Sequence, residues 1–251
     1  MTPPTPTPVT PNSRVALVTG ANSGIGRVTA VELALRGYHV FLACRDAGKT
    51  AEVLDEIAQR SGGTARAEFI ALDLGALDSV RQCAQAFNAR ELPLHLLVNN
   101  AGLAGQKGFT KSGFELAFGV CHVGHFLLTR LLLDRLKAAA PSRVVVVASR
   151  AHRHAKGIDF TAVRQPSRSR GGLMDYSVAK LANILFAAEL GRRMAGTGVT
   201  TYALHPGVVG TNVWRSVPWP LDRLVKLFMI DSEEGAKTTL YCATSDAVAQ
   251  Q

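Results

Sequence analysis

The sequence predicts an α/β fold: a single-domain, doubly wound parallel sheet with helices on both faces. Six short runs of β-branched and aliphatic residues recur along the chain, and longer segments with helical spacing of apolar residues separate them. The runs are apolar almost throughout, which is typical of strands buried on both faces of a parallel sheet. Right-handed crossovers between such strands place helices on both sides of the sheet.

The expected strands cover residues 14–20, 38–45, 67–74, 95–102, 143–149 and 199–207. Residues 26–37 and 48–63 are examples of the intervening helices, because their apolar residues follow helical spacing and each segment ends at glycine. Neither an internal repeat nor a shift in composition marks a second domain, so residues 13–251 are expected to form one domain. Residues 1–12, rich in proline and threonine, are expected to form a flexible tail.

Composition excludes several classes of protein. The chain has 251 residues, of which 47% are hydrophobic and 19% charged, and this balance fits a globular domain rather than a disordered or fibrous chain. Its four cysteines lack the paired spacing of a zinc site or a disulfide framework, which favours a reducing, cytoplasmic location. No run reaches 18 consecutive apolar residues, so a transmembrane span is not expected.

The net charge of +9 leaves several anionic partners open: a polyanion, an acidic membrane surface or a phosphorylated ligand. Nucleic acid is not expected, because the chain carries no recognised nucleic-acid module. Arg164, Arg168 and Arg170 form the one basic cluster, and the Pro, Ser and Gly residues around them indicate a solvated loop.

A glycine-rich loop, TGANSGIG at 19–26, joins the first expected strand to the first helix. Gly20 permits a tight turn, Gly24 lets the backbone approach a pyrophosphate, and Gly26 lets the helix pack closely on the sheet. The helix N-terminus offers N–H groups to the anion, so this context predicts a dinucleotide site although the spacing differs from GxGxxG. The expected contacts in this loop are Gly20, Asn22, Ser23, Gly24, Ile25 and Gly26.

Two charged residues at the end of the second strand compete to select the cofactor. Asp46 stands at about the spacing expected for a carboxylate on the ribose 2′-hydroxyl, but it lies beyond the strand. Arg45 follows the strand directly, beside the neutral Cys44, and a guanidinium there favours a 2′-phosphate. This pattern favours NADP(H) over NAD(H); the alternative is that Arg45 merely caps a surface strand.

Tyr176 and Lys180 lie four residues apart, which places them on one face of a helix. Phenols ionise near pH 10, so a tyrosine needs a nearby cation to exchange protons at neutral pH, and a lysine one turn away supplies it. Ser149 ends the fifth strand, where it can hydrogen-bond a substrate oxygen. A tyrosine and lysine at this spacing are common by chance, but the serine and the glycine loop together predict an active site.

The motifs TGANSGIG, NNAG at 99–102, the strand-end Ser149, YSVAK and PGVVGT together resemble the short-chain dehydrogenase/reductase family. The likeness runs from about 13 to 245, and LACRD, GHFLLT and KLANILFAAEL are similar to its retinol dehydrogenase branch. This resemblance implies a Rossmann-like catalytic domain that oxidises or reduces lipophilic alcohols and aldehydes. It implies that Tyr176 is the acid/base, Lys180 its activator and a ribose ligand, and Ser149 the substrate orienter. Further cofactor contacts that the resemblance implies are Asp73, Leu74, Asn100, Ala101, Gly102, Pro206, Gly207 and Thr211.

Two departures from that pattern bear on the prediction. Cys121 stands where the branch usually has an asparagine of a proton relay, so its catalytic role is in doubt unless its backbone carbonyl serves instead. The chain also stops where the family normally continues into one more strand, so the domain is expected to lack that final strand.

Four histidines, His122, His125, His152 and His154, do not form a recognisable ligand set, so no metal site is expected. The segment 217–230, with Trp219 within it and Phe228 near its end, has three interpretations. It is a lid over an apolar substrate, an amphipathic contact with a membrane surface, or a half-buried helix. Its position favours the lid.

The sequence therefore predicts an NADP(H)-dependent oxidoreductase that interconverts a lipophilic alcohol and its aldehyde or ketone, and we expect a homo-oligomer. The rival hypothesis is a cofactor-binding sensor or scaffold that has lost turnover. The intact Ser149, Tyr176 and Lys180 favour the enzyme.

Overall fold

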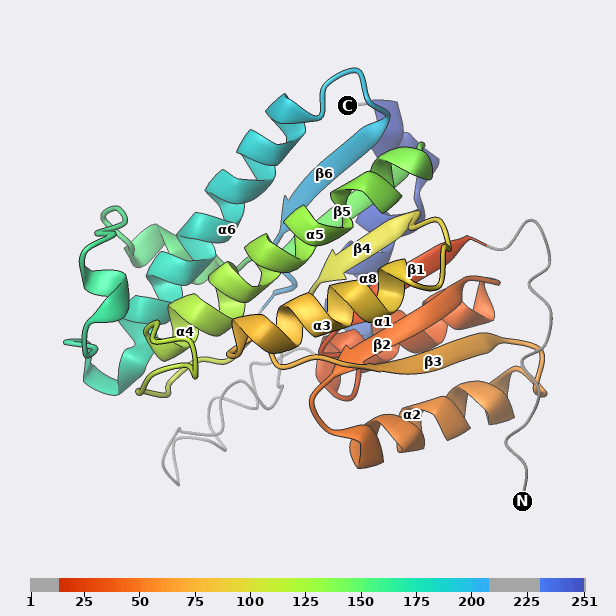
Figure 1. Ribbon diagram of the computed structural model, residues 1–251, viewed down its shortest axis with the longest axis horizontal. Helices are drawn as coiled ribbons and strands as arrows, with labels where there is room; N and C mark the ends of the chain where they lie inside the picture. The colour runs from red at the N-terminus through yellow and green to blue at the C-terminus, as the bar shows by residue number, and fades with distance from the viewer. Residues whose placement is uncertain (1–13, 208–230, 251) are drawn as a thin grey trace.

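The computed structural model describes residues 14–207 and 231–250 and contains one six-stranded sheet (Figure 1). Every pair of neighbouring strands is parallel, and the strand order is β3-β2-β1-β4-β5-β6. The strands are β1 (Val15–Thr19), β2 (His39–Cys44), β3 (Arg66–Ala71), β4 (Leu96–Asn99), β5 (Ser142–Val147) and β6 (Val199–Leu204). The predicted fold class and all six predicted strands are confirmed.

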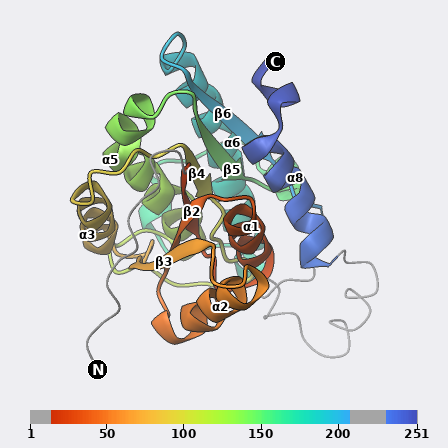
Figure 2. The same ribbon diagram turned by 90° about the vertical axis from the view of Figure 1, so that its right-hand side faces the viewer.

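Helices cover both faces of the sheet (Figure 2). The main helices are α1 (Gly24–Leu35), α2 (Ala47–Arg60), α3 (Leu77–Asn88), α5 (Gly124–Ala138), α6 (Leu173–Arg193) and α8 (Ser232–Thr244). Shorter helical segments are α4 (Leu116–Phe118), η1 (Gly119–Val123), η2 (Arg150–His154), η3 (Ala162–Arg164), η4 (Arg170–Gly172) and η6 (Asp246–Gln250).

The alternation of side chains along β1 explains the two layers. Val15 and Leu17 pack toward α3, α5 and α6, whereas Ala16 and Val18 pack toward α1, α2 and α8. All four are buried. The expectation that every strand is buried on both faces is wrong at the two edge strands, β3 and β6, where most residues are half-buried or exposed. Among the described residues, no further strand pairs with the outer side of either.

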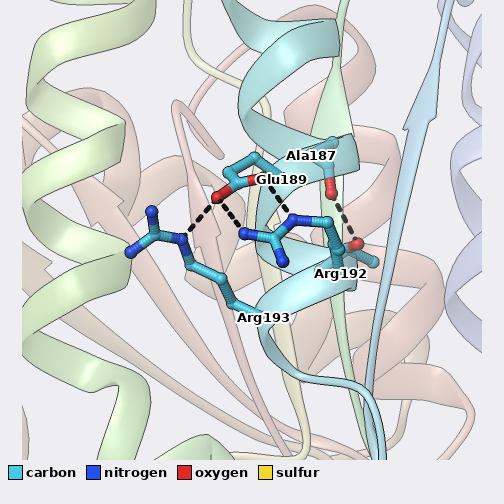
Figure 3. A network of polar contacts seen from close by, with 5 residues as sticks. Ala187, Glu189, Arg192 and Arg193 are labelled. Atoms are coloured by element: carbon cyan, nitrogen blue, oxygen red, sulfur yellow. Dashed lines mark hydrogen bonds and ion pairs between the residues drawn. The ribbon is translucent and has the colours of Figure 1, made fainter.

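The end of α6 is tied to the sheet and to itself by polar contacts (Figure 3). Glu189 accepts hydrogen bonds from Arg192 Nε at 2.8 Å and from Arg193 Nε at 2.6 Å, and these bonds lower the pKa of its carboxyl to about 2. Thr201 Oγ1 on β6 donates to the carbonyl of Ala187 at 2.8 Å. These contacts fix the far end of the helix that carries Tyr176.

A continuous helical stretch, Leu116–Ala138, is long and apolar enough to pass a length-and-composition test for a membrane span. The sequence prediction missed this stretch because it looked for an uninterrupted run of apolar residues. Polar residues and glycines interrupt the run here, although the mean hydropathy of the stretch is high. Half of its apolar window is buried inside the protein, and Leu128, Leu132 and Leu136 belong to the core beneath the sheet. In the structure this stretch is a core helix.

The flexible tail expected at 1–12 and the expected lack of a final strand both stay predictions. The tail at 1–12 lies outside the described residues. Within the described part, β6 is the outermost strand on its side, and Tyr202 Oη donates to the carbonyl of Val248 in η6 at 3.1 Å.

We expect Leu128→Ala to lower the free energy of unfolding by about 2–5 kcal/mol, because Leu128 is fully buried and its loss leaves a cavity. Leu131→Ala on the same helix is the matched control, since Leu131 is 38% exposed. Urea unfolding followed by circular dichroism measures both. An equal loss in the two variants would show that α5 is not packed as described.

Candidate active site

The glycine loop between β1 and α1 needs glycine at positions 20, 24 and 26. Gly20 and Gly24 have φ angles of +66° and +54°, in the left-handed region. A Cβ placed on Gly26 would lie 2.3 Å from the carbonyl oxygen of Gly20 and 2.4 Å from Nδ2 of Asn100. The loop therefore folds back against the start of α1, as a backbone that must approach a pyrophosphate requires.

The first turn of α1 keeps its N–H groups available. Ser23 is the N-cap residue, but its side chain makes no capping hydrogen bond, and the first turn carries no acidic residue. Uncapped N–H groups and the positive end of the helix dipole suit a bound phosphate. The loop and the helix end thus fit the pyrophosphate of a dinucleotide.

The ends of β1 and β4 are joined through Thr19. Its Oγ1 accepts hydrogen bonds from the backbone N–H groups of Asn100 at 2.9 Å and Ala101 at 3.0 Å, and lies 2.8 Å from Nε2 of His125. Asn100 Nδ2 donates in turn to the carbonyl of Thr19 at 2.9 Å. These bonds place the predicted residues of NNAG beside the glycine loop. The role of His125 was missed, because it lies 106 residues from Thr19 in the sequence.

A surface hollow of about 780 Å³ lies beyond β2 and β3, where the adenosine end was predicted. Its lining residues are Arg45, Asp46, Ala47, Ala71, Leu72, Asp73, Ser79 and Lys111. Asp46 is the N-cap of α2, and its carboxylate accepts from the backbone N–H of Lys49 at 3.0 Å. The carboxylate of Asp73 pairs with Lys111 Nζ at 3.2 Å.

The prediction from sequence included Arg45 and Asp73 but missed Lys111, because nothing in the local sequence links residue 111 to the end of β3. Leu74, which the resemblance implied beside the adenine, packs its side chain into the core instead of lining this hollow. Arg45 and Lys111 line the hollow together with the carboxylates of Asp46 and Asp73, and Cys44 at the strand end is buried.

Tyr176 and Lys180 lie on α6 as predicted, with Lys180 Nζ 5.4 Å from the centre of the Tyr176 ring. Lys180 is only 3% exposed, and its Nζ donates to the carbonyl of Val147 at 2.7 Å. Val147 ends β5, two residues before Ser149, so this bond ties the lysine to the strand end that carries the serine. The structure therefore brings α6 and the end of β5 together.

Ser149 is the N-cap of η2, and its Oγ accepts from the backbone N–H of Ala151 at 3.2 Å. A hydroxyl that accepts one bond keeps its own proton for a further partner. The nearby His152 contacts the carbonyl of Ser149 through Nδ1 at 2.7 Å. Ser149 thus stands at the carboxyl edge of the sheet with a free donor.

Cys121 lies in η1, a π-helical turn between α4 and α5, and is fully buried. Its Sγ lies 3.5 Å from the backbone N and O of Leu103. A Cβ on Gly102 would lie 3.5 Å from this sulfur and 3.6 Å from Lys180 Nζ, so the three residues meet. Burial raises the pKa of Cys121, against the opposing effect of the Lys180 charge, and the thiol therefore stays protonated.

The remaining candidate residues lie away from these groups or outside the described residues. Gly207 donates its N–H to His205 Nδ1 at 3.1 Å beyond β6, next to Pro206, whereas Thr211 and the whole segment 217–230 lie outside the described residues. Arg164 is not merely solvated: its guanidinium lies 3.8 Å from the centre of the Phe114 ring. Among the described residues, no three His, Cys, Asp or Glu side chains gather in a way that would hold a metal ion.

Comparison with known proteins agrees with this geometry. A family profile described as short chain dehydrogenase matches residues 14–219. Dehydrogenase/reductase SDR family member 13 from Bos taurus is 48% identical over 94% of this chain, and Retinol dehydrogenase 12 from Homo sapiens is 45% identical over 94%. The chain spans 63% of the length of the bovine protein and 74% of the human one.

Among solved structures, a variant of actinorhodin polyketide ketoreductase with NADPH is similar, with a TM-score of 0.72 and 25% identity. The match covers 94% of this chain and 92% of that one.

We expect the free energy of unfolding to fall as the pH drops below about 6.5, and His125 to account for part of the fall. Burial lowers its pKa to about 3 in the folded protein, so between pH 6.5 and 3 the unfolded chain binds a proton that the folded protein excludes. In His125→Asn the slope should be shallower by at most about 1.4 kcal/mol per pH unit. Urea unfolding from pH 7 to 4 measures it. His154→Asn is the control, because His154 is exposed, and the prediction is wrong if both variants keep the wild-type slope.

Proposed function

The chain belongs to the short-chain dehydrogenase family, and from this premise we propose that it is an NADP(H)-dependent oxidoreductase interconverting a lipophilic alcohol and its aldehyde or ketone. The observation that carries the proposal is the buried Lys180, bonded to the end of β5 and one helical turn from Tyr176. The strand end beside it carries Ser149, and the glycine loop faces the same edge of the sheet.

The glycine loop, the uncapped start of α1 and the N–H groups held by Thr19 would bind the dinucleotide. When bound, a nicotinamide cofactor supplies the hydride acceptor or donor. The protein's own residues handle the proton and the substrate oxygen. Tyr176 gives its phenolic proton to the oxygen in reduction and takes it back in oxidation.

Lys180 Nζ lies 5.4 Å from the centre of the Tyr176 ring, where its ammonium would stabilise the negative charge that develops on the phenolic oxygen as the proton leaves. Ser149 donates its free hydroxyl proton to the same substrate oxygen and so orients the carbon that exchanges hydride. Water is excluded from this reaction by the cluster around Tyr176, which includes Phe118, Cys121 and Ala179.

Preference for NADP(H) is supported by the hollow beyond β2. Arg45 and Lys111 line it, and its two acidic residues are both engaged: the Asp46 carboxylate caps α2, and the Asp73 carboxylate pairs with Lys111 and accepts from the N–H of Gly75. A lipophilic substrate is supported by the likeness to Retinol dehydrogenase 12. The rival hypothesis of a sensor without turnover is not favoured, because Tyr176, Lys180 and Ser149 are all present and Lys180 is bonded to the strand end that leads to Ser149.

Self-association is part of the proposal. Phe126 on α5 and Leu185 on α6 are 41% and 52% exposed, on neighbouring helices where Phe126 contacts Phe186 with ring centres 5.5 Å apart. Exposed apolar side chains in contact favour a homo-oligomer, which we expect in the cytoplasm.

The proposal is tested with a panel of alcohols and carbonyl compounds, following the absorbance of reduced cofactor with NADPH and with NADH. We expect Tyr176→Phe to lower kcat at least about 100-fold while dinucleotide Kd changes little, because only the phenolic oxygen is lost. Near-parental turnover in this variant would remove Tyr176 from the mechanism.

For cofactor choice, Arg45→Ala and Lys111→Ala should each raise the Kd for NADPH about tenfold or more and leave that for NADH nearly unchanged, since each removes one charged contact to the 2′-phosphate. Lys49→Ala is the matched control, because Lys49 is an exposed cation on α2 outside the hollow. Calorimetric titration gives both constants. An equal increase in Kd for NADPH and NADH would show that Arg45 and Lys111 attract both cofactors through their charge and do not contact the 2′-phosphate.

A further inference from the structure

His125 is a polar side chain in the core whose two ring nitrogens reach two separate parts of the site. It lies on the first turn of α5 and is 2% exposed. Nε2 lies 2.8 Å from Oγ1 of Thr19, at the end of β1, and Nδ1 lies 3.0 Å from the carbonyl oxygen of Cys121 in the π-helical turn. A single ring therefore bridges the glycine loop and the turn beside Lys180.

Counting donors and acceptors assigns the proton on this ring. The carbonyl of Cys121 can only accept, so Nδ1 must carry a hydrogen. The hydroxyl oxygen of Thr19 already accepts from the N–H groups of Asn100 and Ala101, which occupies both lone pairs. Its own proton then points to Nε2, which must be unprotonated; the other acceptor, the carbonyl of Val98, is more distant at 3.3 Å.

The neutral form of the His125 ring is the one that satisfies both hydrogen-bond partners. A hydrogen on Nε2 would face Thr19, whose lone pairs are both in use, and would leave a buried donor without an acceptor. Burial disfavours the imidazolium as well, and the charges of Lys180 and His122 act in the same direction.

We propose that His125 is a positioning residue with two functions: through Nε2 it orients the Thr19 hydroxyl that holds the backbone at residues 100–101, and through Nδ1 it holds the Cys121 carbonyl in the π-helical turn. The first function serves dinucleotide binding and rests on the proposed function above. The second keeps the turn in contact with Gly102 and Lys180, where a proton passes to and from Tyr176.

Two substitutions separate these functions. The amide of asparagine reaches the position of Nδ1, so His125→Asn keeps the bond to Cys121 and loses that to Thr19. The longer glutamine reaches the position of Nε2, so His125→Gln keeps the bond to Thr19 and loses that to Cys121. His122→Asn is the matched control, because His122 is a half-buried neighbour that contacts Asn183 and not Thr19.

We expect His125→Asn to raise the Kd for dinucleotide about fivefold to tenfold, the scale of one lost hydrogen bond, and His125→Gln to leave it within about twofold. His125→Gln should instead lower kcat several-fold. Thr19→Val should raise the Kd at least as much as His125→Asn, because it also removes the acceptor of the Asn100 and Ala101 N–H groups. The double variant should bind no more weakly than Thr19→Val alone, because the bond between the two side chains is already lost there. Thr19→Ser, which keeps the hydroxyl, should bind as the wild type does.

Two measurements on the protein without cofactor test the inference independently. Nitrogen-15 NMR of labelled histidine should show the hydrogen of His125 on Nδ1, and amide hydrogen exchange at Asn100 and Ala101 should be faster in His125→Asn but not in His125→Gln. A hydrogen on Nε2 overturns the inference. So does an equal effect of the two variants on Kd and exchange, which would mark His125 as a packing residue only. If the wild type binds neither NADPH nor NADH, the proposed function fails, whereas the NMR and exchange results still decide the role of His125.

Discussion

The reversal of strand order between β1 and β4 is the constraint on which the site depends. At that point the crossovers leave in opposite directions, and a crevice opens at the carboxyl ends of the strands. At this edge Thr19 and Asn100 exchange hydrogen bonds that join the ends of β1 and β4, and Gly26 lets α1 start directly against Gly20. A side chain at Gly26 would collide with the Gly20 carbonyl oxygen and with Asn100 Nδ2, and so would displace α1 from the strand ends.

The catalytic groups depend on the same edge. β5 ends beside β4, and the hydrogen bond from Lys180 to Val147 attaches α6 to that strand end. Ser149 and Tyr176 thus lie at the same edge of the sheet, although the segments η2, η3 and η4 separate them along the chain. The rigid sheet supplies the positions, and the side chains supply the chemistry.

Sequence reasoning predicted those parts of the site whose signal is local. The glycine loop, the Tyr176–Lys180 spacing and the strand-end Ser149 each lie within a few residues of the element that positions them. His125 and Lys111 could not be predicted in this way, because their partners lie far away in the sequence: Thr19 ends β1, and Asp73 lies two residues beyond β3. The partial burial of the edge strands β3 and β6 was also missed, since an apolar run does not reveal whether its strand stands at an edge.

The π-helical turn at Gly119–Val123 has a geometric consequence for the long helix that contains it. One additional residue in a turn rotates the residues before it by about 100° relative to the residues after it. The helix can therefore place Cys121 against Gly102 and Lys180 and, beyond the turn, direct Leu128, Leu132 and Leu136 into the core under the sheet. A regular α-helix through the same residues would bring one of these two surfaces out of phase. The π-helical turn is thus a phase shift that lets one helix serve both the hydrophobic core and the packing against Gly102 and Lys180.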